Sequence, residues 1–141
     1  MFLTEKELKE KFWSNYNRTK RAKRWQFECP IREGNADLIT IESFQKNYQV
    51  NAFEFKLNDL KKVFLQAEGN LPYCNKSWIV VPSEKREVIL DRYINYLNEQ
   101  KYIGVICVET GGRYEIIYQP RFKKDMKMSQ TILNVCMTEI N

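Results

Sequence analysis

The sequence contains no histidine. This absence excludes serine–histidine and cysteine–histidine nucleophilic catalysis, nucleases that use a histidine base, and zinc enzymes with histidine ligands. The four cysteines stand far apart and form no Cys-x-x-Cys pair, which argues against a structural zinc site. Any catalysis by this chain must therefore rest on Asp, Glu, Lys, Tyr or a bound metal ion.

Long apolar runs are also missing from the chain. No apolar segment approaches the length of a membrane span, and the charges spread through the first 16 residues are unlike a signal peptide. We therefore expect a cytoplasmic protein of a bacterium, phage or archaeon, with no membrane partner. A length of 141 residues with 43% hydrophobic content suits a single domain with one core.

Positive charge is in moderate excess, with a formal net charge of +5 and a pI near 9.0. One basic cluster contains Arg18, Lys20, Arg21, Lys23 and Arg24, and a second contains Arg121, Lys123, Lys124 and Lys127. Each cluster alone is best interpreted as a solvated face. Both clusters together with an acidic site favour contacts with the phosphates of a polyanion.

Hydrophobic periodicity and turn residues predict an α/β fold with a mixed sheet flanked by helices. Thr4, Asn58 and Ser83 are the expected N-caps of the first three helices. The order is helix, three-strand meander, helix, strand, helix and two-strand hairpin, with a final helix after them. The expected helices are 5–17, one that begins at Asp59 and is ended by Gly69, Asn70 and Pro72, 84–100 and 126–137. The expected strands are 25–31, 36–42, 50–57, 78–81, 103–109 and 113–118, with a polar connection over 44–49.

Charged residues on two neighbouring strands are the main functional signal. Residues 50–57 alternate with a period of two, which puts Glu54 and Lys56 on one face, and Asp37 lies near the start of the preceding strand. Unpaired buried charges are costly, so this grouping makes sense if a divalent cation lies between the carboxylates and the lysine reaches an anionic substrate. Alternatively, Asp37 only caps a turn, and Glu54 and Lys56 pair on a solvated face.

Together, Asp37, the triplet Glu54-Phe55-Lys56 and Gln66 on the next helix resemble the PD-(D/E)XK nuclease superfamily, which has a restriction-endonuclease-like or resolvase-like fold. The resemblance covers a core of about residues 5–82. Residues 83–141 resemble a common extension, so the chain is expected to be one nuclease domain over 1–141. Asn70 stands where the superfamily often has a tyrosine, one helical turn after the glutamine.

The resemblance implies a role for each of these residues. Asp37, Glu54 and the backbone carbonyl of Phe55 would bind Mg²⁺ or Mn²⁺, Lys56 would position or activate water, and Gln66 would orient the lysine, the water or a phosphate. Glu5 is a candidate accessory acid. It lies on the apolar stripe of the first helix, where its alternative role is to favour the helix N-terminus.

The expected function is therefore that of a metal-dependent endonuclease or exonuclease that hydrolyses phosphodiester bonds. The resemblance favours DNA over RNA and is compatible with a homodimer or a larger nuclease, defence or repair assembly. The expected contacts with nucleic acid are Arg18, Lys20, Arg21, Lys23, Arg24 and Lys62. The alternatives are a catalytically inactive protein of the same fold that binds nucleic acid or protein, and an unrelated α/β interaction domain without a metal.

Overall fold

The computed structural model describes residues 1–137, which form one six-stranded sheet whose spatial order follows the chain. The first three strands are antiparallel, β3, β4 and β5 run parallel, and β6 returns antiparallel to β5. The α/β class, the mixed sheet and the order of the elements are thus confirmed. The strands are β1 (Ala22–Arg32), β2 (Gly34–Phe44), β3 (Asn47–Phe55), β4 (Lys76–Pro82), β5 (Ile103–Val108) and β6 (Tyr114–Tyr118).

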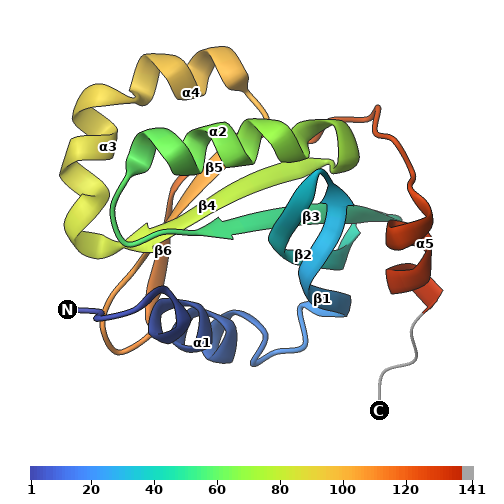
Figure 1. Cartoon of the computed structure of the whole chain (residues 1–141), viewed down its shortest axis with the longest axis horizontal. Coiled ribbons are helices and arrows are strands. Elements are labelled where there is room, and N and C mark those ends of the chain that lie inside the picture. Colours follow the sequence, from blue (N-terminus) through green and yellow to red (C-terminus); the bar gives the residue numbers. More distant parts are fainter. Residues whose placement is uncertain (138–141) are drawn as a thin grey trace.

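Helices cover both faces of this sheet (Figure 1). They are α1 (Glu5–Tyr16), α2 (Leu60–Asn70), α3 (Arg86–Arg92), α4 (Ile94–Gln100) and α5 (Gln130–Met137), with short 3₁₀ turns at Leu71–Tyr73 and Ser83–Lys85. α1 packs on one face, while α2, α3, α4 and α5 pack on the other. No helix within residues 1–137 is long and apolar enough to cross a membrane.

The first helix is fixed by its cap and by an apolar stripe. The Thr4 hydroxyl accepts a hydrogen bond from the Glu7 amide at 3.0 Å, as the capping pattern predicts. Leu8, Phe12 and Tyr16 recur at intervals of four and are all buried against the sheet. This packing holds the first turn of α1 beside the end of β3.

The predicted helix over 84–100 is wrong. The chain forms two short helices, α3 and α4, because Tyr93 leaves helical geometry at φ −115° and ψ 2°. The Tyr93 ring stacks on Phe64 of α2 with centroids 4.6 Å apart. Two short helices joined by a bend place their buried residues, Ile89 and Leu97, in the same cluster.

Other expected boundaries also change. The predicted polar connection over 44–49 is mostly strand, because a tight turn with Gln45 at φ 54° lets β3 begin at Asn47. Asp59, rather than Asn58, caps α2 by accepting from the Lys62 amide at 3.2 Å. Ser83 makes no capping hydrogen bond, and the terminal helix begins at Gln130 rather than 126.

Gly104 on β5 allows close packing over the sheet. A Cβ at this position would lie 2.5 Å from Pro120 Cδ and 2.7 Å from the Trp78 ring. We expect Gly104→Ala to reduce the free energy of unfolding by about 1–3 kcal/mol, because overpacking forces neighbours off their positions. Urea denaturation checks this, with Gly111→Ala as the control because no atom lies within 4 Å of its Cβ position. Equal stability of the two variants would contradict this packing.

Candidate active site

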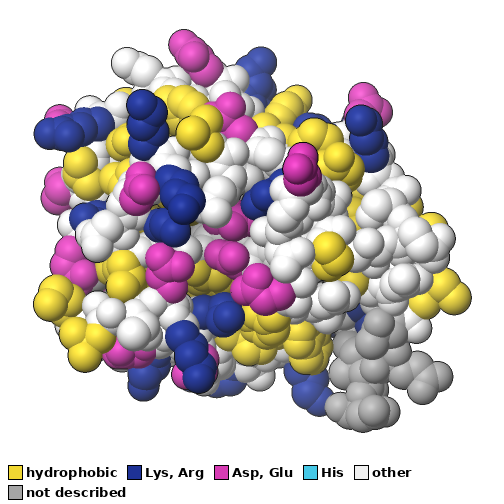
Figure 2. Space-filling model, in the orientation of Figure 1, with side chains coloured by type: hydrophobic (Ala, Val, Ile, Leu, Met, Phe, Trp, Pro, Cys, Tyr) yellow, Lys and Arg dark blue, Asp and Glu magenta, His cyan; other side chains and the backbone are white. Residues whose placement is uncertain are grey.

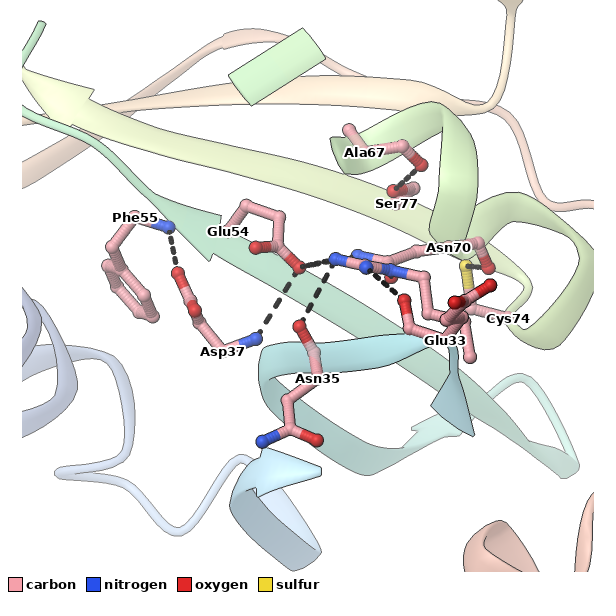
Figure 3. A network of polar contacts seen from close by, with 10 residues as sticks. Glu33, Asn35, Asp37, Glu54, Phe55, Ala67, Asn70, Cys74 and Ser77 are labelled. Carbon is pink, nitrogen blue, oxygen red and sulfur yellow. Dashed lines mark hydrogen bonds and ion pairs between the residues drawn. The ribbon is translucent and has the colours of Figure 1, made fainter. Parts of the chain in front are cut away.

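The two predicted metal ligands lie next to each other across β2 and β3. The strands pair as far as Leu38 and Phe53, and Asp37 and Glu54 are the next residues at this end of the two strands. The Asp37 amide donates to Glu54 Oε2 at 3.4 Å, which fixes the backbone of one acid to the side chain of the other (Figure 3).

Asp37 is half-buried and is held by the backbone of β3. Its Oδ2 accepts a hydrogen bond from the Phe55 amide at 2.8 Å. Burial raises the pKa of the Asp37 carboxyl, and the neighbouring carboxylates of Glu28 and Glu5 raise it further. Negative charge from several elements therefore converges on this point.

The Glu54 side chain is fully buried, at 0% exposure. Its Oε2 accepts from Asn70 Nδ2 at 2.8 Å and lies 3.4 Å from Arg32 Nη2. Oε1 has no hydrogen-bond partner among the described residues. Burial has the larger effect and the charge of Asp37 the smaller one, and both raise the pKa of Glu54, to about 7. One oxygen of this carboxylate is thus compensated by the protein and the other is not.

Arg32 and Asn70 belong to the site, although sequence reasoning did not include them. Arg32 Nε donates to Asn70 Oδ1 at 2.7 Å, so the two side chains support each other as they contact Glu54. The other guanidinium nitrogens donate to the carbonyls of Glu33 and Asn35 at 3.1 Å. The available signals were Arg32 directly before the turn Glu33-Gly34-Asn35, and Asn70 one helical turn after Gln66.

Lys56 follows the last residue of β3, and its side chain is only 18% exposed. Its Nζ lies 3.5 Å from Glu5 Oε2 on the first turn of α1. The structure therefore brings the candidate accessory acid Glu5 to the predicted lysine. Figure 2 shows acidic side chains gathered between α1 and α2, with basic side chains among them.

The remaining predicted residues lie further from the carboxylates. Gln66 is half-buried on α2, one turn before Asn70, and its side chain makes no hydrogen bond to the described residues. Lys62 is exposed near the start of α2, about 12 Å along the helix from Asn70. The basic segment 18–24 follows the far end of α1, about 16 Å of helix from Glu5.

The donor set suits a hard cation with few protein ligands. Within residues 1–137, no group of three or more Asp, Glu, Cys or His side chains could hold a metal ion. Any ligation of a metal ion here would therefore rest on Asp37, Glu54 and a backbone carbonyl, of which Phe55 is the predicted one. Mg²⁺ commonly binds one or two carboxylates and keeps several waters, so the unpartnered Glu54 Oε1 fits such an ion. The Arg32 guanidinium would compete with it for Glu54.

Comparison with known proteins supports the fold alone. No protein-family model and no curated protein match the chain. Among solved structures, a protein of unknown function from Silicibacter pomeroyi is similar, with a TM-score of 0.59 over 96% of this chain and 82% of that chain. The two sequences are 15% identical, so the similarity concerns architecture and does not extend to activity.

The raised pKa of Glu54 predicts a pH-dependent stability. A group whose pKa rises on folding, here from 4.5 to about 7, stabilises the folded state fully below 4.5 and loses this contribution as the pH rises through 7. Relative to Glu54→Gln, which cannot ionise, the wild type should lose stability from pH 5 to pH 8. The slope for one proton is at most about 1.4 kcal/mol per pH unit.

Urea denaturation of both proteins at pH 5, 6, 7 and 8 measures this difference. Glu54→Gln keeps the volume of the side chain and an oxygen that can accept from Asn70, so the variant should fold. A difference in unfolding free energy that stays constant across the four pH values would show that Glu54 ionises at its ordinary pKa.

Proposed function

We propose that this chain is a Mg²⁺- or Mn²⁺-dependent nuclease that hydrolyses phosphodiester bonds. The observation that carries the proposal is Glu54 Oε1, a buried carboxylate oxygen with no partner among residues 1–137, which lies beside the second carboxylate of Asp37. A bound cation would compensate both carboxylates. The preference for DNA over RNA comes from the resemblance to the PD-(D/E)XK superfamily.

The protein groups around the carboxylates fix their positions. The Phe55 amide holds Asp37 Oδ2, and Asn70 with Arg32 holds Glu54 Oε2, which leaves Glu54 Oε1 to a cation. When bound there, the ion would polarise the phosphodiester and lower the pKa of a ligated water. Preorganised ligands of this kind spare the reorganisation that flexible carboxylates would need.

Lys56 is the group best placed to act on the substrate or on the attacking water. It follows β3 directly, two residues after Glu54, and its ammonium is oriented by Glu5 at 3.5 Å. In the proposed reaction Lys56 holds the water or a phosphate oxygen against the scissile bond. Glu5 acts through Lys56 as a positioning residue. Gln66 keeps its proposed supporting role one turn before Asn70 on α2.

A second candidate function is that of an inactive nuclease fold that only binds nucleic acid or protein. Arg32 supports it, because its guanidinium lies 3.4 Å from Glu54 and already supplies positive charge to the carboxylate. An arginine that never leaves Glu54 would make a cation unnecessary. Calorimetric titration with Mn²⁺ separates the two functions. The nuclease requires that Mn²⁺ binds to the wild type and does not bind to Glu54→Gln, whereas the inactive fold has no such requirement.

Cleavage of both strands of a duplex would need a second copy of the site. One active site cuts one strand at a time, so a homodimer or a partner within a larger nuclease, defence or repair assembly remains part of the proposal. A cytoplasmic location is also proposed, in keeping with the finding that no described helix could span a membrane.

Nicking of supercoiled plasmid DNA tests the proposed activity. We expect nicking with Mg²⁺ or Mn²⁺, none with EDTA, and a loss of at least about 100-fold in rate in Lys56→Ala and in Glu54→Gln, because each removes a group that acts on the transition state. Lys61→Ala is the matched control, since it removes the same charge from an exposed position on α2. Metal-dependent nicking that survives in both site variants would refute the assignment.

A further inference from the structure

A groove at the connection between α1 and β1 contains basic residues that the proposed hydrolysis does not use. Its volume is about 530 Å³, within the range of ligand-binding clefts. Next to it, a second hollow of about 310 Å³ shares one arginine with the groove. Among the described residues, no acidic side chain lines either one. The groove contains Arg18, Lys20, Lys23, Arg24 and Trp25, and the hollow adds Arg21 and Arg113 to the shared Arg18.

The basic side chains of the groove are available to a ligand. None of the four forms an ion pair within residues 1–137, and three of them are exposed. Arg24 is half-buried, and its Nε is a buried donor without an acceptor among the described residues. Arg24 is opposite Ile41 in the sheet and also lines a separate hollow with Tyr48 and Cys136, so the groove depends mainly on the three exposed residues. Concentrated charge of one sign therefore faces solvent without ion-pair partners among the described residues.

Aromatic side chains lead from this groove toward the carboxylates. Trp25 packs on Trp13 with centroids 5.4 Å apart, and Trp13 packs on Phe27 at 5.3 Å. The Lys9 ammonium lies 5.4 Å from the centre of the Phe27 ring. All three rings are half-buried, so part of each faces solvent.

The register of β1 on β2 gives the direction of the aromatic row. Trp25 is opposite Thr40 and Phe27 is opposite Leu38, the residue after Asp37. Two residues of strand, about 7 Å, therefore separate the groove end of the row from its Asp37 end. The row and the basic groove form one continuous seam along α1 and β1, which ends beside the candidate active site.

We propose that this seam binds a single strand of nucleic acid, with its phosphates in the basic groove and its bases against the aromatic row. Basic grooves with aromatic platforms suit single strands because unpaired bases offer their faces for stacking, whereas a duplex keeps them stacked on each other. Strand binding stands on the seam alone. Delivery of the bound strand to Asp37 and Glu54 rests on the proposed nuclease function.

The test is fluorescence anisotropy of a labelled 20-nucleotide oligo(dT) with the full chain in EDTA, at several salt concentrations. Lys20→Gln/Lys23→Gln should lower the slope of log K against log salt by about 1.4, since each lost phosphate contact on a single strand contributes about 0.7. The matched control is Lys46→Gln/Lys101→Gln, which removes two exposed lysines that lie outside both basic clusters. Its slope should equal that of the wild type.

Trp25→Leu should weaken binding of the oligonucleotide about tenfold, and Trp25→Phe should restore most of it, because a phenyl ring still offers a stacking face. Circular dichroism and melting temperature confirm that both variants fold. Parallel titrations with a 20-base-pair duplex and with anionic phosphatidylserine vesicles identify the class of ligand. The single strand should bind more tightly than the duplex, and vesicle binding should be insensitive to Trp25→Leu.

The inference is overturned if the control double variant loses as much salt dependence as the seam variant, if Trp25→Leu leaves oligonucleotide binding unchanged, or if duplex or vesicles bind more tightly than the single strand. Its failure is distinguishable from failure of the proposed function. If the seam binds a single strand but no metal-dependent cleavage occurs, only the proposed nuclease function is refuted. If cleavage occurs but the seam variants bind the oligonucleotide as the wild type does, only the proposed binding at the seam is refuted.

Discussion

Burial of the Glu54 carboxylate where β2, β3 and α2 meet is the constraint on which the site depends. A carboxylate at 0% exposure must be protonated or compensated by positive charge and hydrogen-bond donors. Asn70 and Arg32 supply these to one oxygen only. Burial and the nearby charge of Asp37 together raise the pKa of Glu54. A proton neutralises the carboxylate at low pH, and the proposed metal ion would compensate it in the ionised form.

The candidate site combines residues from helices that pack on opposite faces of the sheet. α1 packs through Leu8 and Phe12 on one face and carries Glu5 to Lys56. α2 packs on the other face and ends at Asn70, which contacts Glu54. Both contacts occur near the end of β3, where the chain leaves the sheet. The site therefore needs no long loop, because two helix ends and two strand ends converge there.

Much of this framework could be predicted from local patterns. The period of four from Leu8 to Tyr16 reflects burial of one helix face, which the sequence encodes directly, whereas the strand around Glu54 is buried on both faces. The break at Tyr93 could not be predicted, because the stripe from Ile89 to Leu97 also suits one long helix. Only packing of Tyr93 on Phe64, far away in the chain, decides it.

The same distinction between local and long-range signals applies to the candidate site. Adjacency of Asp37 and Glu54 followed from the meander, since consecutive antiparallel strands pair. The contact of Arg32 with Asn70 spans 38 residues and depends on how α2 crosses the sheet. No local pattern in the sequence predicts how a helix crosses a sheet. Sequence reasoning therefore found the carboxylates and the lysine but missed the side chains that hold Glu54.

The most direct test of the central claim is a crystal of the protein soaked in MnCl₂, with anomalous diffraction to locate the ion. The account predicts a manganese peak within ligand distance of Asp37 and Glu54 Oε1, with its remaining positions filled by water and a backbone carbonyl. A map with no peak there at millimolar Mn²⁺, and with Arg32 still against Glu54, would contradict it.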